Sequence, residues 1–134
     1  MGIVGFDHWV ITSGNVERTI EFYRSLGCKI VFEQIPGQKH KRPTIRIGEF
    51  QKINIHPPET EGNPRIDTAR MPTIGSADFC IEWKGTSNEI QKLLEENSIT
   101  PIIGPTPKQC AQGIGLSTYI RDPDGNLVEL TIYE

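Results

Sequence analysis

The sequence has few cysteines, no run of one charge sign and no long apolar segment. Its three cysteines, Cys28, Cys80 and Cys110, follow no regular spacing, which argues against a disulfide scaffold. We expect Cys28 and Cys80 in the core and Cys110 in a loop. The net charge of −3 is spread along the chain, so no nucleic-acid or membrane-surface footprint is indicated.

The chain also lacks the signals that direct proteins out of the cytoplasm. The start, MGIVGFDHWV, has neither the basic residues nor the long apolar stretch of a signal peptide. No segment is apolar for long enough to cross a bilayer. A cytoplasmic location is therefore predicted, with no membrane partner.

What is present is a pattern of elements that occurs twice. The first half predicts a helix with apolar positions from Val16 to Leu26 and strands over 3–12, 28–33, 44–48 and 51–56. The second half predicts a helix after a Thr86–Glu89 capping box and strands over 76–83, 99–103, 116–121 and 126–133. Residues 35–43 and 104–115 are expected to be loops.

This repetition predicts an α+β fold. We expect one domain over 1–134, with module 1 at about 1–57, a linker at about 58–75 and module 2 at about 76–134. Each module has the order β-α-β-β-β. Two such modules could pair into an open barrel that encloses a cavity.

One carboxylate lies in the last apolar strand, within the stretch RDPDGNLVEL. Strand alternation places Glu129 on the face opposite Val128 and Leu130. Burying an unpaired carboxylate costs several kcal/mol, so such a group is usually paired, hydrogen-bonded or bound to a metal. The other reading is a solvated residue on an open face.

The same alternation turns further polar side chains toward the cavity: His8, Asn54, His56 and Asp78. All five residues fall in the first and last strands of the two modules, and four of them have side chains that commonly bind metals. His8 and His56 belong to module 1, and Asp78 and Glu129 to module 2. Imidazole and carboxylate suit Zn, Ni, Fe or Mn, so His8, His56, Asp78 and Glu129 are predicted metal ligands. Taken singly, each also fits a structural role, such as a satisfied strand histidine or a turn carboxylate.

Two longer stretches resemble a known family. FDHWVITSGNVERTIEFYRSLG and YIRDPDGNLVEL resemble the strand histidine, the helix ending in FY-x-x-x-LG and the DPDGN signature of the vicinal oxygen chelate superfamily. This is the glyoxalase, bleomycin resistance and dioxygenase group. INIH followed by GSADFCIE resembles the glyoxalase-domain-containing protein 5 type within it.

The resemblance implies paired βαβββ modules, often a homodimer, and a divalent metal with two positions left for adjacent substrate oxygens. His8 matches the histidine ligand of the first strand, and Glu129 the glutamate ligand of the last. Asp78 stands where many members have a second histidine, which is a departure. Glyoxalase I also has a glutamate in its fourth strand, where this chain offers Asn54 and His56.

The predicted function is that of a metal-dependent lyase or isomerase resembling lactoylglutathione lyase. Glu129 would act as the base, and Asn54, Arg46 and Arg121 would bind a small substrate. One alternative is an extradiol-type dioxygenase that uses Fe(II) or Mn(II). Another is a metal-free protein that binds an antibiotic of the bleomycin type, and a thiol transferase ranks below both.

Overall fold

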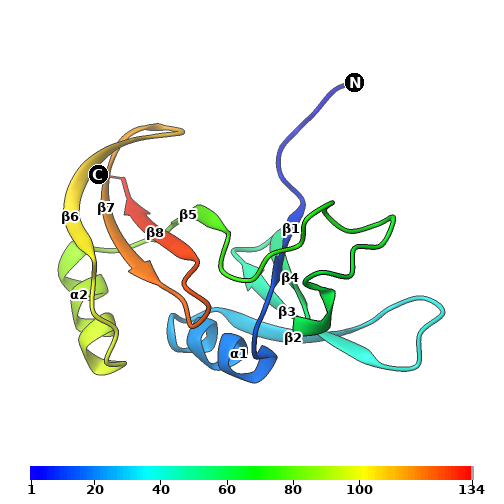
Figure 1. Cartoon of the computed structure of the whole chain (residues 1–134). Coiled ribbons are helices and arrows are strands. Elements are labelled where there is room, and N and C mark those ends of the chain that lie inside the picture. Colours follow the sequence, from blue (N-terminus) through cyan, green and yellow to red (C-terminus); the bar gives the residue numbers. More distant parts are fainter. Residues whose placement is uncertain (134) are drawn as a thin grey trace. The chain divides into compact units, whose positions relative to one another are not determined.

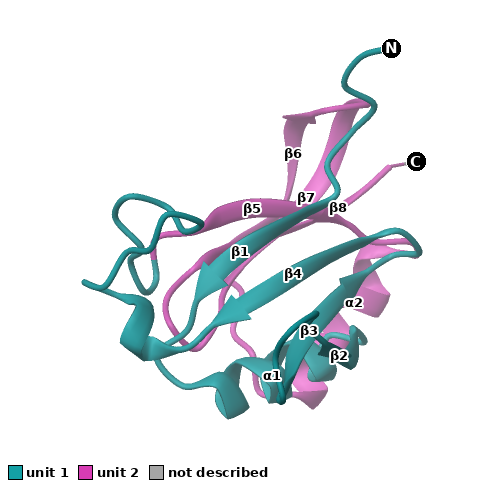
Figure 2. Cartoon of the chain, turned by 90° about the vertical axis from the view of Figure 1, so that its right-hand side faces the viewer, with its two compact units in different colours: residues 1–75 teal, residues 76–134 magenta. Residues whose placement is uncertain are grey.

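The computed structural model describes residues 1–133, and the chain divides into two compact units, Met1–Gly75 and Ser76–Glu134 (Figure 2). Each unit has the order β-α-β-β-β and forms its own four-stranded sheet. The predicted α+β fold with two βαβββ modules is confirmed. No helix in residues 1–133 has the length and apolar character needed to span a membrane.

The sheet of unit 1 has the strand order β1-β4-β3-β2 (Figure 1). Its elements are β1 (His8–Thr12), α1 (Val16–Ser25), β2 (Lys29–Gln34), β3 (Lys41–Ile47) and β4 (Gln51–His56). β1 and β4 are parallel, and the other pairs are antiparallel. The first strand and the last strand of the module are therefore neighbours.

The buried face of this sheet carries four isoleucines. Ile11 lies opposite Ile55, and Ile53 lies opposite Ile45. All four are almost fully buried, as is Tyr23 on α1. Helix α1 begins at the N-cap Asn15, whose side chain accepts a hydrogen bond from the backbone N–H of Arg18. Polar side chains of β1, β3 and β4 are left on the other face.

Unit 2 repeats this topology with the strand order β5-β8-β7-β6. Its elements are β5 (Asp78–Glu82), α2 (Ser87–Glu96), β6 (Ile103–Cys110), β7 (Gly113–Arg121) and β8 (Leu127–Ile132). The Thr86–Glu89 capping box is present at the start of α2, as predicted. Ile90 and Leu94 of the helix are buried, together with the apolar residues Ile120, Val128 and Leu130 of the sheet.

Two predicted strand starts are wrong. The first strand begins at His8 and not near residue 3, because His8 is the first residue of β1 that pairs with β4. Strand β3 begins at Lys41 and includes Pro43. Proline is tolerated there because the β3–β4 register starts only at Thr44, so the missing N–H interrupts no pair with β4.

The largest error concerns residues 104–115, which were expected to be a loop. Residues 103–110 form strand β6, and β7 begins at Gly113. β6 lies at the edge of the sheet, where Pro105 and Pro107 remove no required ladder hydrogen bond. Residues 57–75, expected to be mainly a linker, lie in unit 1 and include a short 3₁₀ helix, η1 (Pro58–Thr60).

Candidate functional site

Glu129 lies in the middle of β8 on the face away from α2's apolar packing. In register it stands between Cys80 of β5 and Tyr119 of β7. Its chain neighbours Val128 and Leu130 are buried on the opposite face, which agrees with the alternation seen in the sequence. Glu129 itself is half-buried.

The two register partners of this carboxylate, Cys80 and Tyr119, are uncharged. Burial, followed by the charge of Glu129, raises the pKa of the Cys80 thiol to about 12. Burial and the same charge also raise the pKa of Tyr119. Within residues 1–133, no lysine, arginine or histidine forms an ion pair with Glu129. A cation bound here would compensate a charge that the surrounding side chains do not.

The tip of the β6–β7 hairpin covers part of this face. Cys110 at the end of β6 places its Sγ 3.9 Å from Glu129 Oε1 and 3.5 Å from Thr131 Oγ1. The Gln112 side-chain amide donates to Glu82 Oε2 at 3.0 Å, and the Gln112 backbone N–H donates to the Tyr133 hydroxyl at 3.2 Å. These residues line a pocket of about 250 Å³ beside Glu129.

Asp78 and Arg121 lie on the same face as Glu129, displaced by two residues along the strand direction. Both pair in register with Leu127, two residues before Glu129, which corresponds to about 7 Å along the strand. Asp78 is exposed. Arg121, predicted to bind substrate, donates from Nη1 to the backbone oxygen of Gly125 at 3.2 Å and so is engaged in the turn that follows β7.

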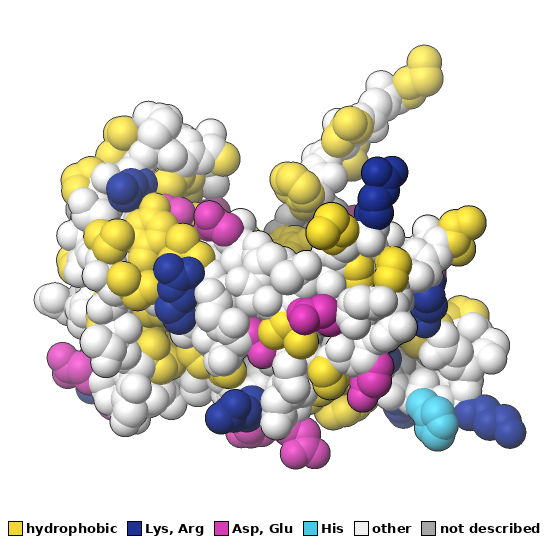
Figure 3. All heavy atoms as spheres, in the orientation of Figure 1, with side chains coloured by type: hydrophobic (Ala, Val, Ile, Leu, Met, Phe, Trp, Pro, Cys, Tyr) yellow, Lys and Arg dark blue, Asp and Glu magenta, His cyan; other side chains and the backbone are white. Residues whose placement is uncertain are grey.

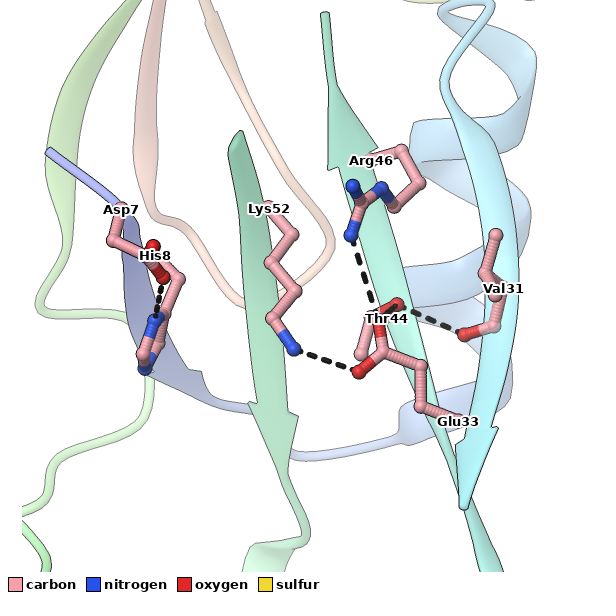
Figure 4. Close-up of polar contacts among 7 residues, drawn as sticks. All are labelled: Asp7, His8, Val31, Glu33, Thr44, Arg46 and Lys52. Atoms are coloured by element: carbon pink, nitrogen blue, oxygen red, sulfur yellow. Dashed lines mark hydrogen bonds and ion pairs between the residues drawn. The ribbon is translucent and has the colours of Figure 1, made fainter. Parts of the chain in front are cut away.

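In unit 1, His8 is oriented by a neighbouring carboxylate (Figure 4). Its Nδ1 lies 2.6 Å from Asp7 Oδ1, and this contact holds the pKa of Asp7 below its usual range. A hydrogen on Nδ1 leaves the Nε2 lone pair available as a ligand. A carboxylate partner on the other ring nitrogen is the usual arrangement of a metal-binding histidine.

Basic side chains continue from His8 across the same face of the sheet. Lys52 lies opposite His8, and Arg46 lies opposite Lys52. Lys52 points away from His8, and its Nζ lies 2.7 Å from Glu33 Oε2 (Figure 4). Arg46 Nη1 lies 3.5 Å from Glu33 Oε1. Lys52 is the main cause of the lowered pKa of Glu33. Asp7 lies near enough for both cations to lower its pKa, so the two carboxylates offset the charges of Lys52 and Arg46. Arg46 still presents a guanidinium, a group that can bind an anionic ligand.

Asn54 is the residue of unit 1 that corresponds in register to Glu129 of unit 2. It lies two residues beyond Lys52, the partner of His8, as Glu129 lies two residues beyond Leu127, the partner of Asp78. Asn54 is buried, and its Oδ1 has no hydrogen-bond partner among residues 1–133. A buried carbonyl oxygen without a partner is a candidate ligand for a metal or a substrate proton.

His56 lies far from His8 on this sheet. It pairs with Thr12, four residues along β1, which corresponds to about 13 Å along the strands. Burial is the main cause of its lowered pKa, and the charges of Arg65 and Arg42 add to it. One metal ion cannot take both histidines of this sheet as ligands in this arrangement.

The two cysteines next to Glu129 were not recognised as site residues. Cys80 was expected in the core, but its side chain is exposed. The alternation of SADFCIEW already placed Cys80 on the face of Asp78 and Glu82, so that signal was available. Cys110 was expected in a loop and lies at the end of β6, because that strand was missed.

Residues 5–130 match the Glyoxalase/Bleomycin resistance protein/Dioxygenase superfamily. The chain belongs to this superfamily. Over its whole length it is 38% identical to the glyoxalase domain-containing protein RDO1 of Mycosarcoma maydis, of which it covers 71%. Over 95% of its length it is 35% identical to the virulence protein STM3117 of Salmonella typhimurium, of which it covers 83%.

Solved structures of the superfamily share the fold. An integron cassette protein from the mobile metagenome of V. cholerae is 35% identical, with a TM-score of 0.87 over 100% of this chain and 98% of that one. More distant is a lactoylglutathione lyase from Agrobacterium tumefaciens, with 22% identity, 98% and 96% coverage and a TM-score of 0.70. The antibiotic-binding protein TnmS3 from Streptomyces has 18% identity, 100% and 99% coverage and a TM-score of 0.72. These last two likenesses establish the fold alone.

Proposed function

We propose that the chain is a metal-dependent enzyme of the glyoxalase superfamily, a lyase or isomerase, acting on a small anionic substrate with adjacent oxygens. The observation that carries the proposal is Glu129, a half-buried carboxylate that lies beside a pocket and forms no ion pair with a lysine, arginine or histidine of residues 1–133. Such a group is suited to holding a cation and to accepting a proton. The glyoxalase-domain-containing protein 5 type and the homodimer remain predictions.

Each unit offers donors suited to a divalent ion: His8 and Asn54 in unit 1, and Asp78 and Glu129 in unit 2. The residues fit this group chemically: His8 is oriented by Asp7, and the buried oxygen of Asn54 lacks a partner. Nitrogen and oxygen donors suit Zn, Ni, Fe or Mn. When bound, the ion would supply Lewis-acid polarisation of the substrate oxygens.

The chain's own residues would bind and deprotonate the substrate. Arg46 lies on the face of His8, and its Nη1 is 3.5 Å from Glu33 Oε1. It would bind the anionic end of the substrate. Glu129 would accept the proton from the carbon next to the polarised oxygens. His56 is assigned to substrate contact and not to the metal, because of its distance from His8.

Two other functions have support of a different kind. The same nitrogen and oxygen donors would serve an extradiol-type dioxygenase with Fe(II) or Mn(II), and the metal found in the native protein separates these chemistries. A metal-free antibiotic-binding protein is supported by the fold of TnmS3 and by Asp78 in place of the usual histidine. The antibiotic-binding function requires no metal, so a chelator should leave ligand binding unchanged.

The test is the binding of Mn²⁺ to untagged protein, measured by plasma mass spectrometry after desalting. Mn²⁺ prefers oxygen and nitrogen ligands, so it reports on this site and avoids thiols. We expect close to one ion per chain in the native protein, and a loss in His8→Ala and in Glu129→Gln. His40→Ala is the matched control, since His40 is exposed in the connection between β2 and β3.

Equal Mn²⁺ in all four proteins would show that neither His8 nor Glu129 binds the ion. Absence of Mn²⁺ from the native protein, together with no uptake of Zn, Ni or Fe(II) that depends on His8, would overturn the enzyme proposal. The antibiotic-binding function would then be preferred.

A further inference from the structure

Unit 2 brings two thiols next to the carboxylate of Glu129. Cys80 comes from β5, Cys110 from β6 and Glu129 from β8. Their ligand atoms all lie within 4.8 Å of one another. We propose that Cys80, Cys110 and Glu129 form a binding site for a thiophilic divalent cation of the Zn²⁺ class, built from unit 2 alone.

The sheet itself holds two of the three donors. Cys80 and Glu129 are direct partners in the parallel β5–β8 ladder, so their side chains project side by side from one face. Neither needs to move along its strand to share an ion. Both are on regular strands, which position ligands more rigidly than loops do.

Cys110 is supplied by the hairpin tip. It pairs with Gly113 across the turn, and its sulfur lies over the face of β8, close to Thr131 and Glu129. The tip is attached to the strands by the bonds of Gln112 to Glu82 and Tyr133.

Gly115 has no side chain, and this leaves room for the Cys110 sulfur and the Thr131 hydroxyl. A Cβ added at Gly115 would lie 2.3 Å from Thr131 Oγ1 and 3.3 Å from Cys110 Sγ. Any residue larger than glycine would therefore push the sulfur or the hydroxyl away. The position of Cys110 over Glu129 depends on Gly115.

The donor set selects a class of metal. Sulfur ligands favour Zn²⁺ and softer ions over Mn²⁺ or Mg²⁺, and Zn²⁺ accepts thiolate and carboxylate together. Three protein ligands leave a fourth position for water or a small molecule, as in open zinc sites. That position faces the pocket of about 250 Å³ that Cys80, Cys110 and Glu129 line.

Hydrogen bonds link the three groups, since Cys80 bonds to Cys110 and Glu129, and Cys110 bonds to Glu129. The Cys110 sulfur contacts Thr131 and Ser117, whose hydroxyls are 2.9 Å apart, and these contacts would satisfy a structural thiol. Cys80 belongs to a different strand and is exposed toward the pocket. Its convergence with Cys110 on one carboxylate is what indicates a site.

Glu129 belongs to both donor sets. A thiophilic ion on the cysteines would therefore remove Glu129 from the metal and from the substrate of the proposed enzyme. This competition, unlike the cysteine site itself, rests on the proposed function.

The test is a titration of the reduced protein with Cd²⁺, which mimics Zn²⁺ and absorbs in the ultraviolet when bound to thiolate. We expect saturation at one equivalent per chain and loss of the absorption in Cys80→Ser and in Cys110→Ser. Cys28→Ser is the matched control, since Cys28 lies in unit 1, and it should titrate like the native protein.

A second measurement uses the unmodified chain, so that it does not depend on a variant that folds. Cd²⁺ should protect Cys80 and Cys110 from alkylation, read by peptide mass spectrometry, and should leave Cys28 unprotected. The proposal is overturned if no absorption develops, if the band persists in both serine variants, or if Cd²⁺ protects neither Cys80 nor Cys110.

The two proposals fail separately. His8→Ala removes a donor of the proposed enzyme site and should leave the Cd²⁺ titration unchanged. Mn²⁺ binding without the Cd²⁺ band would refute only the cysteine site. The Cd²⁺ band without Mn²⁺ binding would refute only the enzyme site.

Discussion

His56 lies about 13 Å along the strands from His8, the other histidine predicted to bind the metal. It was predicted to be a metal ligand because it lies at the end of an inward-facing pattern. Its imidazole is half-buried, and burial and two arginines hold its pKa below the ordinary value of 6.5. A histidine kept neutral by the fold makes stability depend on pH, because the folded and the unfolded chain take up its proton at different pH values.

The first prediction follows from this pKa. The unfolded chain takes up a proton at His56 near pH 6.5 and the folded chain only at lower pH. The stability that neutral His56 provides above pH 6.5 is therefore lost as the pH falls through the folded pKa. Urea unfolding of the native protein should show a larger fall in stability between pH 7.5 and pH 5 than His56→Gln shows.

The exposed His40 supplies the control, and His40→Gln should follow the native pH dependence. Parallel curves for the native protein and His56→Gln would show that burial of His56 has no effect on folding.

At the residue scale the sequence predicted which face a side chain occupies but not which residues are neighbours. Alternation along β8 was enough to place Glu129 opposite Val128 and Leu130, because the period of a strand is two. Register is different, since it depends on how two distant strands align. Counting positions suggested His56 as the counterpart of Glu129, whereas the observed register makes Asn54 the counterpart.

Among the elements, β6 is the one that its local sequence predicted least well. Prolines and glycines between 104 and 115 are typical of a loop, yet 103–110 form an edge strand. An edge position removes the penalty for proline, and it is a property of the whole sheet that no local window contains. The helices were predicted better, because their caps Asn15 and Thr86 act on neighbouring residues.

The second prediction concerns the packing of β7 against β8. Gly115→Ala would bring a methyl group to 2.3 Å from Thr131 Oγ1, so one of the two strands must shift. Overpacking of this kind costs about 1–3 kcal/mol of unfolding free energy, measured by urea denaturation. The hydroxyl contact between Cys110 and Thr131 should weaken with it.

The double variant Gly115→Ala/Thr131→Ala tests the cause. Removing the hydroxyl removes the clash, so the cost of Gly115→Ala should fall in the Thr131→Ala background. An unchanged cost would assign the effect to something other than this contact.

For the whole molecule, the exposed apolar residues bear on the predicted homodimer. The segment before β1 has no regular secondary structure, and Met1, Ile3, Val4 and Phe6 on it are highly exposed. Figure 3 shows hydrophobic side chains spaced along this extended segment. Apolar surface of this kind is typical of a contact with another protein, and a second copy of the chain would supply one.

The third prediction is that Val4→Ser/Phe6→Ser converts a dimer to a monomer, because it removes apolar contact area. Size-exclusion chromatography with light scattering at several concentrations measures the change. Phe50→Ser is the control, since Phe50 is similarly exposed but lies in the turn between β3 and β4. Equal masses for both variants would mean that the N-terminal segment does not mediate association.

The parallel pairing of the first and last strands has a consequence for the order of folding. β2, β3 and β4 form a local meander, as do β6, β7 and β8. By contrast, the paired residues His8 and Lys52, and likewise Asp78 and Leu127, are separated by more than forty residues of chain. Closing such long loops costs more chain entropy than closing a hairpin, so we expect these ladders to form last. Cys80 and Glu129 become neighbours only when the β5–β8 ladder forms. His8 is likewise placed beside the strand of Asn54 only when the β1–β4 ladder forms. In a partly folded chain the hairpins would therefore form before either candidate metal site. A bound ion would stabilise only the completed modules.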